Sequence, residues 1–491
     1  MQSVQPEVFS YDAVAYPAPI LPYLTPDRLA SVLAFGGFEA PDPQTASVLE
    51  IGCGEGLTLC GVASTFPQTR CVGFDLSEPT IRRGSELAGR AGLANVELHA
   101  GDILTWPRDG EKFDYVIAHG VHSWVPRLVQ DALVELIAAR LRPGGVAYVS
   151  YDCLPAVGPK LSINRYLCSM LPEFADPVEK VAAAHALVTV LAANQRKDSR
   201  LRKSLDLLLQ KWPDFNPYYL FHDWISEVYE PSYSSDFAAR AAVHGLSIIG
   251  DAGLNEGYLL DLDEAAQLLV RSTADTGERL ELFDYLHGDQ TFRRTLLVHA
   301  DAPPARSSRG ISNLRFAFHG ERRTRTAENG ETRVGYHAHD GAGIRTTGEL
   351  EQAVMEAFLA QRPAEHSLAS LSVASGVPPS ELEALVRVCA HIGLLECHAT
   401  PTPFVLHPGE RPTCSPLMRE MARAGATAVT PRMTRCELRG DATRALVVMC
   451  DGTRTRADIL AEISSMSESP VDAALIDRAL EDLARDGVFI A

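Results

Sequence analysis

The residues best suited to ligand chemistry lie in one short segment, Glu50 to Gly56, which reads Glu-Ile-Gly-Cys-Gly-Glu-Gly. Gly52 and Gly54 carry no Cβ, so the backbone can turn tightly there and approach a ligand closely. Gly56 lets the following helix pack against the preceding strand. A dinucleotide site would have the spacing G-x-G-x-x-G and a helix N-terminus facing a pyrophosphate, but here the third glycine comes one residue early. The carboxylates of Glu50 and Glu55 would repel a pyrophosphate, and they suit a cationic ligand with a sulfonium and an amino group.

Two further acids follow at regular places along the chain. Asp75 ends an apolar run and precedes Leu76, and its carboxylate can accept hydrogen bonds from both hydroxyls of a ribose. Asp102 follows the next apolar run and can accept from an adenine amino group, with Ile103 against the ring. Each acid alone could be a turn or cap residue. Because ligands of open α/β sheets bind outside the carboxyl ends of the strands, the series predicts that this segment binds S-adenosylmethionine.

Short apolar runs, glycine turns and helical patterns alternate through the first third of the chain, which predicts a parallel sheet with helices on both faces. We expect strands over 47–51, 70–74, 96–99, 113–118 and 145–151, with helices over 57–66, 78–91 and 127–141. Later runs over 246–250 and 295–299 are expected to supply the sixth and seventh strands. The predicted fold class is therefore α/β, a Rossmann-like doubly wound sheet with a helical insertion and C-terminal winged-helix-like modules.

The chain of 491 residues is long enough for several domains. Their predicted bounds are an N-terminal arm or lid over 1–45, a core over 46–155, a helical insertion over 156–235, the remaining core strands over 236–300, a solvated linker over 301–346 and winged-helix-like modules over 347–491. The linker is expected because eight arginines stand there among Gly, Ser and Thr without clear periodicity.

Composition narrows the class of partner and the compartment. The net charge of −18 disfavours a general grip on nucleic acid phosphates, so the tail modules are expected to mediate protein interaction or homodimerisation. No apolar stretch reaches the roughly 18 residues of a membrane span, and the first residues lack the pattern of a secretory signal. None of the ten cysteines forms a C-x-x-C pair, so neither a zinc site nor any other metal site is expected. Free thiols fit a reducing cytosol, and we expect a cytoplasmic protein.

The segment from His119 to Pro126, His-Gly-Val-His-Ser-Trp-Val-Pro, follows the fourth expected strand. Together with Phe113 to Ala118 and Gly145 to Tyr151, it resembles the bacterial methyltransferase family that carries a methyltransferase regulatory domain, which includes rickettsial protein-lysine methyltransferases. Further similar pieces occur at Thr25 to Ala30, at Thr291 to Leu297 and at Cys450 to Arg454. The chain departs from that family after the fifth strand, where the stretch Asp152 to Val157 lacks the usual glycine and tryptophan.

The resemblance implies a methyl acceptor site beside the fourth and fifth strands. His119 is the first candidate for a base or an orienting group, and it can also contact the cofactor. Tyr151 and Trp124 are further candidates for catalysis, whereas a buried anchor is an equal reading of Trp124, and His122 is expected to be an exposed loop residue. Tyr16, with Tyr11 and Asp12, is expected to cover the cofactor as a lid or to form a plain structural arm. A remaining aromatic cluster could line an acceptor channel or form the core of the insertion: Trp212, Tyr218, Tyr219, His222 and Trp224.

Three functions remain open at this stage. The first is methyl transfer to a protein lysine, the second is the tailoring of a small molecule or a ribosomal peptide, and the third is a cofactor-binding regulator that acts through its tail. All six lysines lie between Lys112 and Lys211. A GC-rich genome is the plain explanation and avoidance of self-modification is the sharper one, and composition does not separate them.

Overall fold

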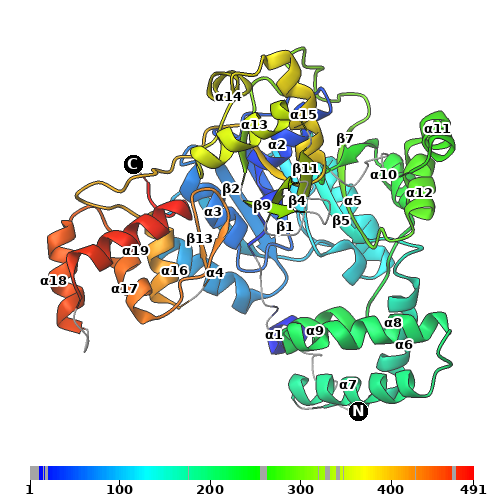
Figure 1. The fold of residues 1–491 in the computed structure, drawn as a ribbon. Helices are drawn as coiled ribbons and strands as arrows, with labels where there is room; N and C mark the ends of the chain where they lie inside the picture. The colour runs from blue at the N-terminus through cyan, green and yellow to red at the C-terminus, as the bar shows by residue number, and fades with distance from the viewer. Residues whose placement is uncertain are drawn as a thin grey trace.

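The computed structural model describes residues 10–14, 16, 20–174, 176–254, 262–318, 320–326, 332–338, 343–346, 348–425, 427–466 and 471–490. A seven-stranded sheet lies at its centre in the order β3-β2-β1-β4-β5-β7-β6 (Figure 1). Its strands are β1 Ser47–Ile51, β2 Arg70–Asp75, β3 Val96–Ala100, β4 Phe113–Ala118, β5 Leu141–Asp152, β6 Leu246–Asp251 and β7 Phe292–His299. Strand β7 runs antiparallel to both of its neighbours, and the other pairs are parallel. The predicted doubly wound sheet is confirmed, including its sixth and seventh strands.

Apolar side chains cover both faces of this sheet. In β1 all five residues are buried, and Val48 belongs to the core on one face while Leu49 and Ile51 belong to the core on the other. One face packs against α2 Pro26–Phe35, α3 Leu57–Thr65 and α4 Glu78–Arg90, and the other packs against α5 Arg127–Arg140 and α10 Ser234–Val243. The remaining elements of this half are η1 Pro22–Leu24, η2 His122–Trp124, α11 Glu264–Ser272 and α12 Thr276–His287.

The insertion consists of helices, as its sequence predicts. They are α6 Gly158–Met170, α7 Pro177–Ala193, α8 Arg200–Lys211, η3 Trp212–Asp214 and α9 Pro217–Trp224. They share a core of their own in which Leu167, Val188 and Leu205 are fully buried. The N-terminal helix α1 Ser10–Ala13 lies beside α9 (Figure 1). There the ring of Tyr11 stacks on His222, with 4.2 Å between the ring centroids.

The linker predicted over 301–346 is wrong. Its described residues form strands β8 Arg315–Phe318, β9 Gly320–Thr326, β10 Thr332–Ala338 and β11 Gly343–Thr346. Phe316, Phe318 and Tyr336 are buried, and β8 pairs with β12 Leu395–His398, so these residues belong to the unit that follows them. The arginines conceal this in the sequence because Arg322 and Arg323 of β9 lie in a run of exposed polar residues, which has the composition of a solvated segment.

The C-terminal residues fold as two groups of three helices in the order that the sequence predicts. The first group is α13 Glu349–Ala360, α14 Leu368–Ser375 and α15 Pro379–His391, and the second is α17 Asp441–Met449, α18 Arg456–Met466 and α19 Ala473–Arg485. Between them lie α16 Pro416–Arg423 and the short strands β13 Ala428–Val429 and β14 Arg435–Cys436. Their assignment as winged-helix units stays a prediction.

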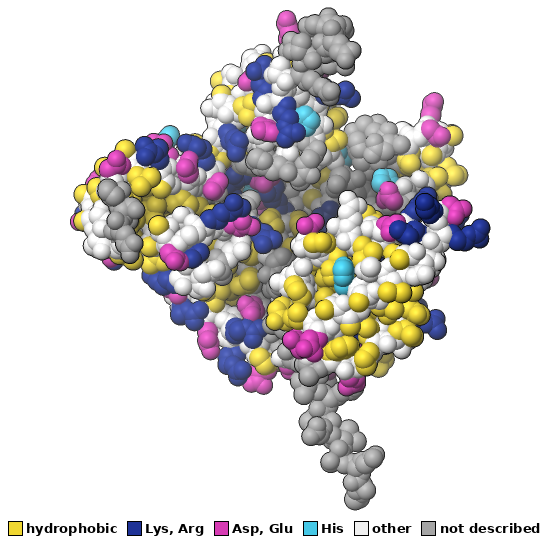
Figure 2. All heavy atoms as spheres, turned by 60° about the horizontal axis from the view of Figure 1, so that its bottom comes forward, with side chains coloured by type: hydrophobic (Ala, Val, Ile, Leu, Met, Phe, Trp, Pro, Cys, Tyr) yellow, Lys and Arg dark blue, Asp and Glu magenta, His cyan; other side chains and the backbone are white. Residues whose placement is uncertain are grey.

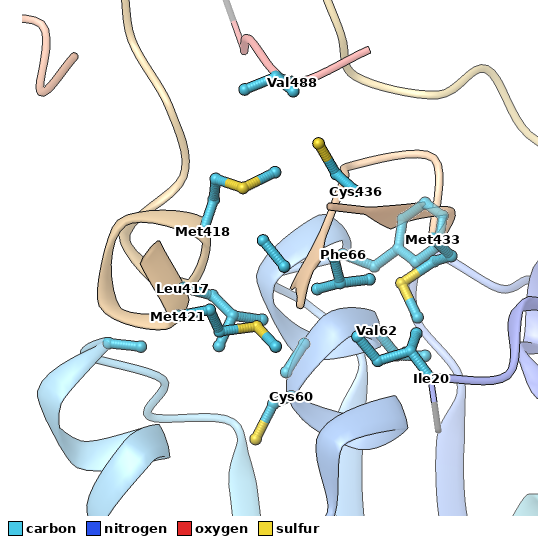
Figure 3. Close-up of a cluster of buried hydrophobic side chains, with 14 of the residues drawn as sticks. Ile20, Cys60, Val62, Phe66, Leu417, Met418, Met421, Met433, Cys436 and Val488 are labelled. Carbon is cyan, nitrogen blue, oxygen red and sulfur yellow. The ribbon is translucent and has the colours of Figure 1, made fainter. Parts of the chain in front are cut away.

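The segment between the two groups, with α16, packs directly on helices α3 and α4. Figure 3 shows Met421 and Met433 above the helix that carries Cys60 and Val62, and these side chains form one continuous apolar core. Gly61 lies at the closest approach, since a Cβ there would come within 2.6 Å of the Met433 Cε atom. No helix of the described residues is both long and apolar enough to cross a bilayer.

Candidate active site

The glycine segment forms a tight loop between β1 and α3. Gly52, Gly54 and Gly56 all have φ between 56° and 69°, a region that glycine enters without strain. A Cβ on Gly52 would lie 2.5 Å from Val121 Cγ2, and one on Gly56 would lie 2.7 Å from Leu98 Cδ2. At Gly54 no atom lies within 4 Å of that position. Two of the glycines therefore allow close packing, and the third leaves space for a ligand.

Asp75 closes this loop from the end of β2. Its carboxylate accepts hydrogen bonds from the amides of Gly54 and Ser77, both at 2.9 Å. Burial raises the pKa of Asp75, and the two amide hydrogen bonds oppose that rise. A carboxylate has about four acceptor positions, so two amides leave capacity for the hydroxyls of a ribose.

Glu50 supplies a second, more buried acid beneath the loop. The residue is 6% exposed, and its Oε2 atom has no hydrogen-bond partner within the described chain. Burial and the nearby charge of Asp75 raise the pKa of Glu50 to about 8. An unpartnered buried carboxyl oxygen is costly unless a ligand satisfies it. The loop, the open side of Gly54 and the two acids thus fit the amino acid and ribose of S-adenosylmethionine.

The remaining predicted contacts lie at the ends of β2 and β3. Ile103 is buried, with 9% exposed, while Leu76 is exposed and lies directly after Asp75. The Asp102 carboxylate accepts a hydrogen bond from the amide of Leu104 at 2.9 Å, so it stabilises the turn after β3. One carboxyl oxygen of Asp102 is engaged in this way, and its contact with an adenine stays a prediction.

His119 stands at the end of β4 within a wall of aromatic rings. Its Nδ1 atom lies 3.0 Å from the hydroxyl of Tyr148, and the rings of Tyr23 and Phe292 each lie 5.7 Å away. Burial, with a contribution from the charge of Arg294, lowers the pKa of His119 to about 4. The imidazole is therefore neutral at pH 7. It can orient an acceptor by hydrogen bonding, but it holds a proton weakly.

Two neighbours lie elsewhere than predicted. Tyr151 is 1% exposed and belongs to the core beneath the sheet, where its ring stacks on Phe237 with centroids 4.5 Å apart. Its side chain points to the face opposite Tyr148 because successive residues of a strand alternate. The prediction that Tyr151 takes part in catalysis is therefore wrong. His122, expected to be exposed, is completely buried against the same two rings.

The N-terminal arm lies close to two acids, Asp75 at the end of β2 and Asp223 of α9. Tyr16 is 39% exposed, and its ring lies 5.7 Å from His222 and 6.1 Å from Tyr219. Burial and the charges of Asp75 and Asp223 raise the pKa of Tyr11 to about 12. The arm thus lies between the glycine loop and the insertion. Its role as a lid stays a prediction.

Sequence reasoning missed the residues that join the insertion to β5. Trp124 stacks on Tyr229 with centroids 4.9 Å apart, and the hydroxyl of Tyr229 donates to Asp152 at 2.6 Å. Asp152 also accepts from Lys160 at 3.0 Å. Of these residues the sequence indicates only Trp124. Tyr229, Asp152 and Lys160 stand in no recognisable motif, and they come together only because the insertion packs against β5.

Comparison with known families agrees with this geometry. Residues 48–145 match the family described as a methyltransferase domain, and residues 216–299 match the predicted methyltransferase regulatory domain. The uncharacterized protein RP028 of Rickettsia prowazekii is 30% identical over 235 residues, which cover 47% of this chain and 93% of that protein. The chain belongs to the S-adenosylmethionine-dependent methyltransferases that carry this regulatory domain. Its cofactor is S-adenosylmethionine.

Other relatives of this methyltransferase match in part. The uncharacterized protein RP789 of Rickettsia prowazekii is 28% identical over 62% of this chain and 54% of its own length. The uncharacterized protein sll1526 of Synechocystis is 25% identical over 60% of this chain and 59% of its own length. The chain thus spans somewhat more than half the length of each of these two relatives.

The fold of the methyltransferase has a full-length counterpart among solved structures. PKMT2 from Rickettsia typhi superposes with a TM-score of 0.83 at 21% identity, and the match covers 97% of this chain and 100% of that chain. The same protein in complex with AdoHcy superposes with a TM-score of 0.81 at 22% identity. At these identities the likeness establishes the fold, including the insertion and the tail.

The first prediction concerns Gly84 of α4, which packs on the glycine loop. A Cβ at Gly84 would lie 2.2 Å from the carbonyl oxygen of Glu55, so Gly84→Ala must displace α4 or the loop. We expect a loss of about 1–3 kcal/mol in the free energy of unfolding and weaker cofactor binding. Gly89 is exposed on the same helix with no atom within 4 Å, and Gly89→Ala should add about 0.5–1 kcal/mol. Urea unfolding and calorimetric titration measure both; equal stabilities of the two variants would contradict the packing.

The second prediction concerns the proton on Glu50. Below pH 8 the free protein carries this proton and must release it to place a carboxylate beside the cationic cofactor. Affinity should therefore rise with pH, by roughly tenfold per unit between pH 6 and 8, and then level off. Glu50→Gln should bind more weakly at pH 8 and lose this slope, whereas Glu86→Gln, an exposed change on α4, should keep it. Equal dependence of cofactor affinity on pH in wild type and Glu50→Gln would contradict the assignment of Glu50 as the titrating group.

The third prediction separates orientation from binding at His119. His119→Ala should lower kcat by about 100-fold, the lower end for a group that positions a reacting partner, and leave the cofactor Kd within about twofold. Because the pKa of His119 is about 4, kcat/KM should show no inflection near pH 6.5. Steady-state kinetics and calorimetry test this, and losses of equal size in kcat and cofactor affinity would argue for a structural role instead.

Proposed function

We propose that this methyltransferase transfers the methyl group to the side-chain amine of a lysine in a protein. The observation that carries this proposal is the acidic and aromatic lining beyond the carboxyl ends of β4 and β5. Tyr11, Tyr16 and Tyr219 lie there around Asp223, and burial with neighbouring charges raises the pKa of each of these tyrosines. Neutral phenols and carboxylates favour a cationic or amine acceptor over an anionic one.

Methyl transfer requires the protein chiefly to align the acceptor with the methyl group. S-adenosylmethionine supplies an electrophilic methyl group when it is bound. An amine attacks in line only when it has lost its proton, so the site must position the nitrogen and exclude water. His119 and Tyr148 hold a neutral pair at 3.0 Å that can accept a hydrogen bond from the amine. Arg294 lies over the Tyr23 ring at 4.9 Å, and its positive charge beside this pair disfavours a protonated acceptor.

The insertion favours a macromolecular acceptor over a small one. Figure 2 shows apolar side chains gathered on the outer face of the insertion. Among the exposed ones are Met170 of α6, Val178 and Val190 of α7, Leu207 of α8 and Tyr218 of α9. Such an exposed apolar surface suits contact with another polypeptide. The full-length likeness to PKMT2 of Rickettsia typhi supports the same acceptor class, and the cytoplasmic location stays a prediction.

The fourth prediction tests the acceptor. The purified protein is incubated with cell proteins and methyl-labelled S-adenosylmethionine, and hydrolysed protein and small molecules are analysed separately by mass spectrometry. We expect label in methylated lysine that resists hydroxylamine, since an N-methyl bond is stable where a methyl ester is not. Asp75→Ala should reduce the incorporation to background because it removes the ribose acceptor and the brace of Gly54. Glu86→Ala, an exposed change on α4, should retain it.

Other patterns of label decide against the proposal. Label that appears only in small molecules or only in hydroxylamine-sensitive esters would assign a different acceptor. No incorporation under conditions where calorimetry shows cofactor binding would favour a regulator that binds the cofactor without transferring its methyl group.

A further inference from the structure

One lysine of the chain, Lys160, lies in an unusual environment where the insertion meets β5. The Nζ atom of Lys160, in the first turn of α6, lies 3.0 Å from the Asp152 carboxylate and 3.1 Å from the Asp223 carboxylate. The three side chains are between 9% and 16% exposed. Burial raises the pKa of Asp223, and the Lys160 ammonium opposes that rise. Two partly desolvated carboxylates thus converge on one ammonium.

Three aromatic rings complete the enclosure. The Lys160 Nζ atom lies 4.9 Å from the ring centroid of Trp124, 4.9 Å from that of Tyr229 and 5.6 Å from that of Trp224. Cations bind over such faces within about 6 Å. The side chains of the enclosure come from η2, β5, α9 and the loop after α9. We call the following set the ammonium cage: Trp124, Asp152, Asp223, Trp224 and Tyr229.

The ammonium cage and the His119–Tyr148 pair lie along the same face of β5. Alternate residues of β5 connect the two, because Tyr148 contacts His119 and Ser150 accepts a hydrogen bond from the amide of Gly120 at 2.9 Å. Asp152 is the next residue on the same face of the strand, and its amide donates to Ser123 Oγ at 2.8 Å. Asp223 on the far side acts on Tyr11, which also feels the charge of Asp75.

We propose that the ammonium cage is the binding site for the side chain of the acceptor lysine and that Lys160 is its internal occupant, displaced when the acceptor enters. The proposal rests on the proposed function, since it names the part of that site which recognises the acceptor. A lysine side chain is long and flexible, so Lys160 can leave without movement of α6. Exchange of one ammonium for another leaves both carboxylates with a counterion throughout, which avoids the large cost of a buried unpaired charge.

A purely structural ion pair between the insertion and β5 is the competing explanation, and a cavity experiment separates the two. Lys160→Ala removes the atoms of n-propylammonium from the ammonium cage. We expect this variant to bind n-propylammonium with saturation, seen as a change in tryptophan fluorescence and a rise in Tm, because Trp124 and Trp224 line the cavity. Neutral n-propanol and sodium chloride at equal concentrations should produce neither effect.

A matched variant controls for the loss of a lysine from the insertion. Lys180 of α7 lies over the single ring of Phe221 at 5.5 Å. Lys180→Ala should show no saturable response to n-propylammonium, and neither should the wild type, whose ammonium cage is filled. Absence of saturable binding by folded Lys160→Ala, or an equal response from Lys180→Ala, overturns the proposal.

A second experiment, on the wild type, tests the proposal even if Lys160→Ala does not fold. Acetylation of Lys160 by acetic anhydride is followed by mass spectrometry in tetramethylammonium chloride and in sodium chloride at equal concentration. Displacement from the ammonium cage predicts at least a threefold faster acetylation of Lys160 in tetramethylammonium, with no change at Lys180; equal rates at Lys160 in the two salts overturn the proposal. Neither experiment measures methyl transfer, so a failed ammonium cage is distinguishable from a failed assignment of the acceptor class.

Discussion

The carboxylate of Asp75 is the interaction on which the rest of the site depends. It ties the amide of Gly54, in the loop after β1, to the amide of Ser77, in the turn after β2. Gly54 has a φ of 56°, so the loop adopts a conformation that few other residues tolerate. The carboxylate thus defines the shape of the loop and keeps spare acceptor positions for a ligand. One side chain couples the geometry of the fold to the recognition of the cofactor.

Burial of acids is the second constraint on this region. Glu50 and Asp75 lie at the cofactor loop, and Asp152 and Asp223 belong to the proposed acceptor site. Desolvation raises the pKa of Glu50, Asp75 and Asp223, so each gains from the approach of a positive charge. The donor is a sulfonium, and the proposed acceptor arrives as an ammonium. In this proposal, buried carboxylates attract a positive charge at both the cofactor site and the acceptor site.

The donor half could be predicted from the sequence because its signals are local. Glu50 to Gly56, Asp75 and the strand pattern around them stand at fixed places in a repeating order, and the structure brings them together at the carboxyl ends of β1 and β2. The proposed acceptor site could not be predicted, since it depends on contacts between residues distant in sequence. Lys160 and Asp223 are 63 residues apart in the chain, and nothing near either one indicates the other. Tyr151 was misplaced for a simpler reason: along β5 one residue separates the cleft face from the core face.

The tail is the part whose role the sequence indicates least. Helix α16 and the β13–β14 segment share an apolar core with α3 and α4, the helices that follow the first two strands (Figure 3). The arginine-rich segment before the first group is a set of strands instead of a linker, and its few buried aromatic residues, Phe316, Phe318 and Tyr336, stand among many charged ones. The contact of α16 ties the tail to α3 and α4, so changes in the tail can reach the glycine loop through packing.

A crystal structure of this chain with S-adenosylhomocysteine tests the central claim most directly. The account predicts that the ribose hydroxyls lie within hydrogen-bond distance of the Asp75 carboxylate and that the amino group of the ligand contacts Glu50 Oε2. It also predicts that the ligand lies against the main chain at Gly54. A ligand bound elsewhere, or one at the loop that leaves both acids without contact, would contradict the account.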